Sequence, residues 1–198
     1  MKKIFVRGEN IVNLPNAISL YRLLAFPVIF YAALVGNEPL FVWLLCISLV
    51  SDVADGNLAR YLKQQTHFGA ALDNLADICT YAMAILGLFV FKWADIEPHR
   101  WFLFLLLGLF VVSYIVSFAR FGKMPGLHLY LAVSAGSVQS VFFFVLFVFG
   151  FYAWFFYLAV GWGIVAYTEK IFVLFKLDDI KIGVKGLYWI MKAEKEAK

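Results

Sequence analysis

Long apolar runs separated by short polar breaks dominate the chain. Six such runs lie at residues 20–35, 40–58, 69–91, 101–121, 127–149 and 154–175. A helix needs roughly 20 apolar residues to cross the hydrocarbon core of a bilayer. The first run is short, so we expect it to use part of the segment before it. The pattern predicts an all-α, polytopic membrane protein with about six transmembrane helices and short amphipathic segments at its two ends.

The breaks between the runs carry glycine, proline and charged residues, as helix ends do. They fall at 36–39, 94–100 and 122–126, whereas the break near 150–153 is weak, so the last two spans could be divided differently. Residues 1–19 are interpreted as an interfacial lead-in, with Asn16 or Ser19 as candidate helix caps. We expect no cleavable signal, because no uninterrupted apolar core precedes the first span.

The composition excludes a soluble globule. Hydrophobic residues make up 64% of the chain, its mean hydropathy is +0.84, and the short links leave no room for a soluble insert. We therefore expect one membrane domain over residues 1–198. Topology accounts for the formal net charge of +4, so the charge does not indicate nucleic-acid binding.

Positive charge is distributed unevenly between the two sides of the predicted membrane protein. Of 17 Lys and Arg residues, all but Lys92 and Arg100 fall on the side of the termini. By the positive-inside rule, we expect both termini and the link after the second span, with its active-site acids, to lie in the cytoplasm. We expect the membrane to be a bacterial-type inner or cell membrane. The basic tail, 176–198, is either an amphipathic segment on anionic lipid or a solvated tail.

Four aspartates, Asp52, Asp55, Asp73 and Asp77, interrupt the apolar pattern and are called the four motif aspartates below. On helices, the first two share one face at a spacing of three residues, and the last two share one face at a spacing of four. The polar segment 61–68 can turn the chain, so the two faces can meet. Facing carboxylates repel, and bound divalent cations resolve that repulsion; oxygen ligands suit Mg²⁺, Mn²⁺ or Ca²⁺ rather than zinc.

Small residues accompany these acids. Gly56, Ala59 and Gly69 leave room for a ligand to approach the backbone, and Arg60 offers a fork for phosphate. The alternatives are a polar helix pair buried for structural reasons and, for Arg60, an anchor at the membrane surface. Intramembrane acids are costly and usually functional, which favours a site.

The spacing Asp52-x-x-Asp55-Gly56-x-x-Ala59-Arg60-x8-Gly69-x3-Asp73-x3-Asp77 resembles the signature of the CDP-alcohol phosphotransferase family, with each specified position filled. The resemblance implies transfer from a CDP-linked lipid to an alcohol with release of CMP, on a site with two Mg²⁺ or Mn²⁺ ions. It also implies a homodimer among membrane lipids. Asp52, Asp55 and Asp73 would be metal ligands, and Asp77 the general base and a further metal contact. Gly56, Ala59 and Gly69 would line the cytidine pocket.

The segment from Asn13 to Pro27 resembles the opening of the phosphatidylglycerophosphate synthase branch of that family. In this resemblance Asn16 and Ser19 contact the nucleotide or pyrophosphate of the donor, unless they only cap a helix. Arg22 either binds phosphate or anchors the helix by extending to the membrane surface.

Three basic residues near the fourth break, Arg120, Lys123 and His128, are candidates for binding the acceptor. Such cations suit an acceptor that carries phosphate, and glycerol 3-phosphate is the first choice; inositol phosphate, phosphatidylglycerol and serine are alternatives. Anchoring explains Arg120 and Lys123 equally well, and His128 suits a structural role at a helix start. The chain also departs from the expected Gly-Lys-x-Lys-Thr, because Gly122-Lys123 is followed by Met-Pro-Gly-Leu.

Two other classes of protein deserve comparison with a transferase. A cation transporter could line its path with intramembrane acids. However, the four motif aspartates lie at one membrane face, and Glu169, in the last span, is also near the cytoplasmic end. A membrane scaffold would not need the complete signature. The pattern therefore favours an enzyme of phospholipid biosynthesis.

Overall fold

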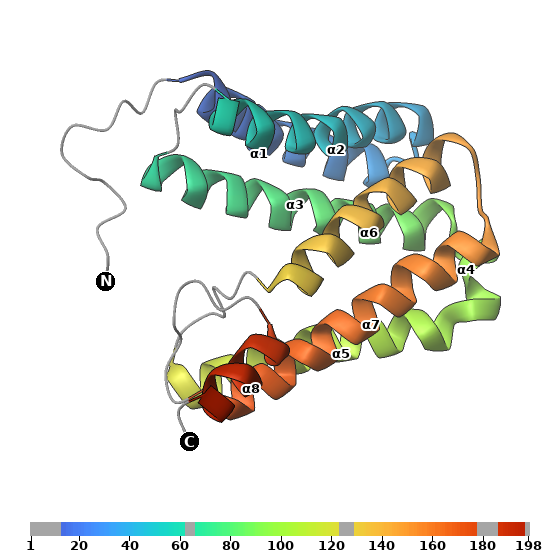
Figure 1. Ribbon diagram of the computed structural model, residues 1–198. Coiled ribbons are helices and arrows are strands. Elements are labelled where there is room, and N and C mark those ends of the chain that lie inside the picture. The colour runs from blue at the N-terminus through green and yellow to red at the C-terminus, as the bar shows by residue number, and fades with distance from the viewer. Residues whose placement is uncertain (1–12, 62–65, 123–128, 178–185, 197–198) are drawn as a thin grey trace. The chain divides into compact units, whose positions relative to one another are not determined.

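The computed structural model describes residues 13–61, 66–122, 129–177 and 186–196, and for residues 53–60 it describes the helical backbone alone. Within these ranges the chain forms helices and no strand (Figure 1). The elements are α1 (Leu14–Leu34), α2 (Glu38–Tyr61), α3 (His67–Phe91), α4 (Trp93–Ile96), the 3₁₀ turn η1 (Glu97–His99), α5 (Arg100–Phe121), α6 (Tyr130–Val148), α7 (Ala153–Lys176) and α8 (Leu187–Glu196).

Five segments of the described chain are long and apolar enough to cross a membrane. They are Leu14–Leu34, Ala71–Phe91, Trp93–Phe121, Tyr130–Val148 and Ala153–Lys176. The remaining predicted span, 40–58, which is the second along the chain, falls on the 24-residue α2, part of which is described only as backbone. The prediction of an all-α polytopic membrane protein is confirmed. The weak break is also real, because Gly150, with a φ of +100°, separates α6 from α7.

The start of α1 differs from the sequence-based expectation. The N-cap is Asn13, whose side-chain oxygen accepts a hydrogen bond from the backbone N–H of Asn16 at 2.9 Å. Pro15 fits the first turn because an N–H is not needed there. Asn16 and Ser19 lie inside the helix, so the prediction that one of them caps it was wrong. The earlier start gives α1 21 residues, which explains how a short apolar run reaches spanning length.

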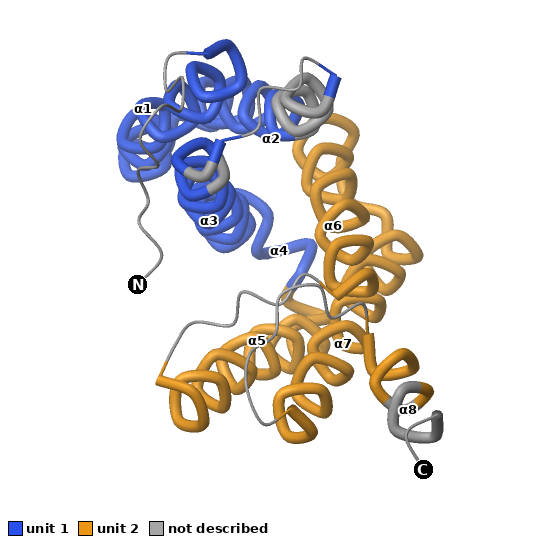
Figure 2. Tube along the Cα trace, turned by 60° about the vertical axis from the view of Figure 1, so that its left-hand side comes forward, with its two compact units in different colours: residues 1–96 blue, residues 97–198 orange. Residues whose placement is uncertain are grey.

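Two compact units divide the chain, one over residues 1–96 and one over 97–198 (Figure 2). They are described separately, and a single domain over 1–198 stays a prediction. In the first unit α1 packs against both α2 and α3. The start of α2 meets the end of α3 through the Glu38–Lys92 salt bridge, at 2.8 Å, and the Phe41–Phe91 ring pair. These two helices therefore run antiparallel.

The buried face of α1 changes character along its length. Its N-terminal half buries Asn16, Ser19 and Arg22, whereas its C-terminal half buries small or apolar residues such as Ala25 and Ile29. Each of these residues lies three or four positions from the next, so successive members are neighbours on the helix surface. Polar groups are thus directed into the first unit near the beginning of α1, where the motif-bearing ends of α2 and α3 also lie.

In the second unit α7 packs against both α5 and α6. A core of Leu129, Val173, Leu174 and Leu177 receives Leu187 and Ile190 from α8. The backbone N–H of Leu187 also donates to Glu169 Oε1 at 2.9 Å. Part of the basic tail is therefore a helix packed on the unit, in which Tyr188 and Trp189 are exposed and the Trp189 ring contacts Tyr130 of α6. Its placement on anionic lipid stays a prediction.

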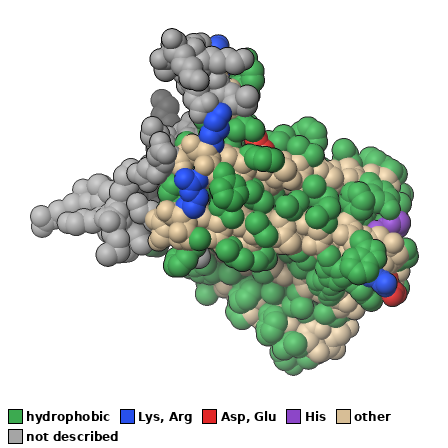
Figure 3. Space-filling view, turned by 90° about the horizontal axis from the view of Figure 1, so that it is seen from below, with side chains coloured by type: hydrophobic (Ala, Val, Ile, Leu, Met, Phe, Trp, Pro, Cys, Tyr) green, Lys and Arg blue, Asp and Glu red, His purple; other side chains and the backbone are tan. Residues whose placement is uncertain are grey.

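Large apolar side chains cover much of the described surface, and one such face is shown in Figure 3. Trp43 and Trp101, for example, are 71% and 73% exposed. Contiguous apolar surface of this kind is rare on soluble monomers and is expected where lipid replaces water. Apolar side chains thus face outward, while α1 buries polar side chains against its neighbours. This is the distribution expected of a protein surrounded by lipid.

Candidate active site

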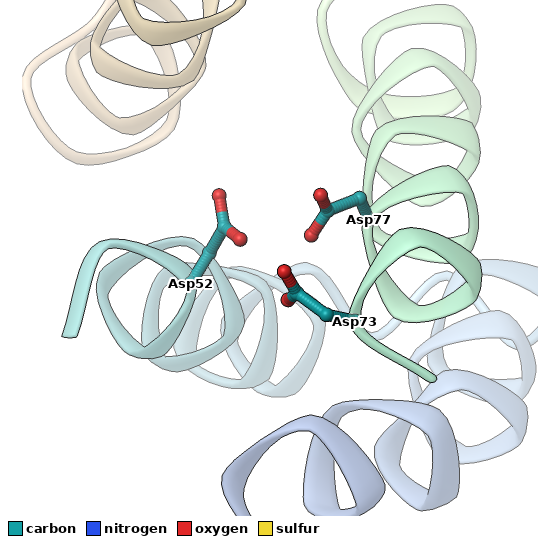
Figure 4. A group of neighbouring side chains, drawn as sticks. All are labelled: Asp52, Asp73 and Asp77. Atoms are coloured by element: carbon teal, nitrogen blue, oxygen red, sulfur yellow. The ribbon is translucent and has the colours of Figure 1, made fainter. Parts of the chain in front are cut away.

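Three of the four motif aspartates meet between two helices. Asp52 comes from α2, whereas Asp73 and Asp77 come from one face of α3, a helical turn apart, and their carboxylates point toward one another (Figure 4). One oxygen from each lies within 4.8 Å of the others. We call these three residues the carboxylate cluster. The antiparallel course of α2 and α3 brings them together, because it places the end of α2 beside the beginning of α3.

Arg22 of α1 joins all three carboxylates. Its Nη1 donates to Asp52 Oδ1 at 2.7 Å and to Asp77 Oδ1 at 2.6 Å, and its Nη2 donates to Asp73 Oδ1. The Arg22 side chain is 0% exposed, whereas the side chains of the carboxylate cluster are 25–39% exposed. The interpretation of Arg22 as an anchor reaching the membrane surface was wrong, because its guanidinium is turned inward onto acids.

The donor set fits a divalent cation. Three carboxylate oxygens gathered in one place suit a hard ion such as Mg²⁺ or Mn²⁺. The Arg22 guanidinium already shows that the cluster accepts a cation. With all three acids ionised, three negative charges and one positive charge leave a formal charge of −2, which further positive charge would neutralise. The carboxylate cluster could therefore hold a metal ion; the fourth motif aspartate, Asp55, lies on α2 with its side chain outside the description.

The beginning of α3 packs tightly against α1. Thr66 caps α3, and its Oγ1 accepts from the backbone N–H of Gly69 at 2.9 Å. A Cβ at Gly69 would lie 2.2 Å from Asn16 Oδ1 and 2.8 Å from Thr66 Oγ1. The sequence had suggested that Gly69 leaves room for a ligand. In the structure the space in front of it is occupied by the buried side chain of Asn16.

The other predicted donor-binding residues lie on the same helices. Ser19 is buried on α1, and its hydroxyl donates to the backbone oxygen of Pro15 at 3.2 Å. Gly56, Ala59 and Arg60 belong to the last turns of α2, where side chains are outside the description.

The predicted acceptor-binding residues belong to the second unit. Arg120 of α5 donates from Nη1 to the backbone oxygens of Leu174, at 2.8 Å, and Phe175. It thereby satisfies carbonyl groups at the end of α7 that lack a partner within their own helix. Lys123 and His128 fall outside the described residues.

Lys170 is a buried cation that the sequence analysis counted only as a charge on the cytoplasmic side. It lies on α7, is 6% exposed, and places its Nζ over the rings of Tyr114 and Tyr167 at 5.0 and 5.6 Å from their centroids. No carboxylate forms a salt bridge with it in the described part of the chain. Its position inside an apolar run was a signal in the sequence, because ionisable residues in spans are usually functional.

Comparisons with known proteins give a family match over the segment that contains this site. A CDP-alcohol phosphatidyltransferase family model matches residues 12–169, a range that includes the carboxylate cluster and Arg22. A CDP-diacylglycerol–glycerol-3-phosphate 3-phosphatidyltransferase of Aquifex aeolicus is 35% identical over 94 residues, 48% of this chain and 53% of that protein. Proteins of the same name from Salmonella choleraesuis and Escherichia coli K12 are 35% and 34% identical over 77 residues, 37% of this chain and 42% of those proteins.

The chain thus spans about half the length of the curated relatives it matches. No solved structure matches it. The family model covers most of the chain, and its match confirms the resemblance carried by the spacing from Asp52 to Asp77. The chain therefore belongs to the CDP-alcohol phosphatidyltransferase family.

Proposed function

We propose that the protein transfers a phosphatidyl group from CDP-diacylglycerol to glycerol 3-phosphate, forming phosphatidylglycerophosphate and releasing CMP. The observation that carries the proposal is the carboxylate cluster, whose members stand at the family's signature positions on α2 and α3. Family membership supports the CDP-linked donor, and the names of the similar proteins support the acceptor. Inositol phosphate, phosphatidylglycerol and serine are less favoured acceptors.

The reaction joins the acceptor oxygen to the phosphorus that carries diacylglycerol. The bond between that phosphorus and the oxygen bridging it to CMP breaks, and CMP leaves with the bond's electrons. In our proposal Asp77 accepts the proton of the acceptor hydroxyl. Asp52, Asp55 and Asp73, with Asp77 as a further contact, would hold two Mg²⁺ or Mn²⁺ ions. When bound, the ions supply charge that neutralises the pyrophosphate and stabilises the leaving group.

Donor recognition is assigned to the helix ends around the cluster. Gly56, Ala59 and Gly69 would border the cytidine, and Arg60 would pair with phosphate. Asn16 and Ser19 are buried on the inward face of α1, which supports a role in shaping this region. The contact between Asn16 and Gly69 suggests that glycine is needed there for helix packing as well.

A phosphorylated acceptor needs cations of its own. Arg120, Lys123 and His128 remain our proposed acceptor-binding residues. Lys170 is added to them because its ammonium is buried, lies over two tyrosine rings and forms no salt bridge among the described residues, so it could pair with an anion. The excess of Lys and Arg on one side supports an active site and termini in the cytoplasm. A homodimer embedded in membrane lipids completes the proposal.

The proposal is tested by measuring CMP release from CDP-diacylglycerol by the purified protein in detergent with Mg²⁺ or Mn²⁺. Each acceptor is supplied separately, and the lipid product is identified by mass spectrometry. We expect phosphatidylglycerophosphate with glycerol 3-phosphate and little product with the other acceptors. Release of CMP with a different acceptor alone would correct the substrate. Absence of CMP release with every acceptor, from folded protein, would reject the transferase proposal.

A further inference from the structure

Arg22 engages the carboxylate cluster as a cation would. Its guanidinium reaches one oxygen, Oδ1, of each of the three acids, and it does so from a side chain with no exposed surface. We propose that Arg22 is a positioning residue that holds the cluster together before divalent cations bind and competes with them for the same oxygens. This inference rests on the proposed function, because it concerns the metal-dependent site of that reaction.

The first half of the inference follows from repulsion. The cluster draws its members from two helices, and like charges at these distances repel strongly in a medium of low dielectric constant. A guanidinium can bridge several carboxylates because its N–H groups point outward in a fixed planar fork. A lysine ammonium carries the same charge but is compact and sits on a flexible stem. Arg22 thus offers both the charge and the geometry that keep α2 and α3 in register with α1 at this end.

The second half follows from shared oxygens and from charge. A divalent ion that takes the Oδ1 atoms must displace the N–H groups already bonded to them. Two divalent ions carry four positive charges, and the four motif aspartates carry four negative charges when ionised. A guanidinium retained beside a fully loaded site would therefore be in excess. Once released, its charge would suit the pyrophosphate of the donor.

The competing explanation is a permanent support. Each carboxylate has a second oxygen, so Arg22 could keep the Oδ1 atoms while metal ions used the Oδ2 atoms. The two explanations predict opposite effects of removing the guanidinium. Competition predicts that metal binding tightens when Arg22 is replaced, whereas permanent support predicts that it weakens because the ligands lose their arrangement.

The test compares Mn²⁺ binding and thermal unfolding of the purified full-length protein and its Arg22→Met variant, at one pH. Mn²⁺ affinity is measured by electron paramagnetic resonance of the free ion, and unfolding is followed with EDTA and with saturating Mn²⁺. We expect Arg22→Met to bind Mn²⁺ at least about fivefold more tightly, the lower end of typical coupling between two ligands. Its Tm should fall in EDTA and rise toward the wild-type value in Mn²⁺.

Two further variants keep the test decisive. Arg22→Lys preserves the charge but not the fork, so it should give a smaller change of the same sign, and it replaces Arg22→Met if that variant does not fold. Arg120→Met removes an arginine that bonds backbone carbonyls of α7, so its Tm should fall equally in EDTA and in Mn²⁺. Unchanged or weaker Mn²⁺ binding by both Arg22 variants would overturn the inference. Failure of the wild-type protein to bind Mn²⁺ would instead reject the metal site on which the proposed function depends.

Discussion

Among the residues whose side chains are described, each unit of the protein buries one Lys or Arg in a helix, and the two cations have different surroundings. Arg22 in the first unit contacts three carboxylates, whereas Lys170 in the second unit contacts the rings of Tyr114 and Tyr167. A buried ion pair needs good geometry to offset desolvation, and the fork of Arg22 provides it. A ring face attracts a cation more weakly than a carboxylate does, and it takes up none of the cation's N–H donors.

The difference shows which interactions depend on each of the two buried cations. Arg22 is bound into a network whose members depend on one another, so removing it leaves three acids without their counter-charge. Lys170 has no such dependents among the described residues, so its loss leaves mainly apolar packing. The first cation is therefore expected to matter for the architecture of the site, and the second for what the protein binds. The predictions below separate these roles, beginning with the largest effect.

Removing metal should abolish activity. We expect no CMP release in EDTA and recovery with Mg²⁺ or Mn²⁺, because excess negative charge at the carboxylate cluster would oppose binding of an anionic donor. Asp73→Asn should remain inactive after metal is returned, while Gly161→Ala on α7, where nothing lies within 4 Å of a Cβ, should respond to EDTA and metal as the wild-type protein does. Full activity of the wild-type protein in metal-free buffer would contradict the metal-dependent mechanism.

Replacing the proposed base should slow turnover without loss of donor. Asp77→Asn keeps the side-chain volume and one carbonyl oxygen but cannot accept the proton. Loss of a general base typically costs about 10²–10⁴ in rate. Single-turnover rate and metal-dependent affinity for CDP-diacylglycerol should be measured together, with Asp52→Asn as the comparison. If Asp77→Asn loses donor affinity as severely as Asp52→Asn does, then Asp77 serves chiefly as a metal ligand.

The two buried cations should differ in their contribution to stability. In EDTA, Arg22→Met should lower the free energy of unfolding by about 3–5 kcal/mol, as expected when one partner of a buried ion network is removed. Lys170→Met should change it by less than about 2 kcal/mol, because no salt bridge is lost among the described residues and methionine fills similar space. Denaturant unfolding in detergent measures both. Equal losses would show that the aromatic setting stabilises its cation as much as the acids do.

The smallest effect concerns glycine. Gly69→Ala should lower the free energy of unfolding by about 1–3 kcal/mol, because the added methyl overlaps Asn16 and Thr66. Gly161→Ala on α7 is the matched control, since nothing lies within 4 Å of a Cβ there and alanine favours a helix. Its stability should be unchanged or slightly higher. No loss for Gly69→Ala would mean that α1 and α3 separate there at little cost.

Hydropathy and spacing were sufficient for the fold class and for the acids of the site. Apolar runs of membrane-spanning length dictate helices, since every backbone polar group in lipid must be bonded within its own segment. The spacing of Asp73 and Asp77 fixes their common face by helical geometry alone. The start of α1 was less predictable, because Asn13, Asn16 and Ser19 can each cap a helix and only the folded backbone selects Asn13.

Tertiary structure alone decided the partners of the two buried cations. Arg22 is 30, 51 and 55 residues from Asp52, Asp73 and Asp77, so no local periodicity relates it to them. Its contacts depend on how α1 packs against α2 and α3, a long-range arrangement that one apolar pattern does not specify. Sequence determined which residues carry charge inside the apolar runs. Packing determined which of those charges face acids and which face rings, because a side chain's partners across helices depend on the rotation of each helix about its own axis.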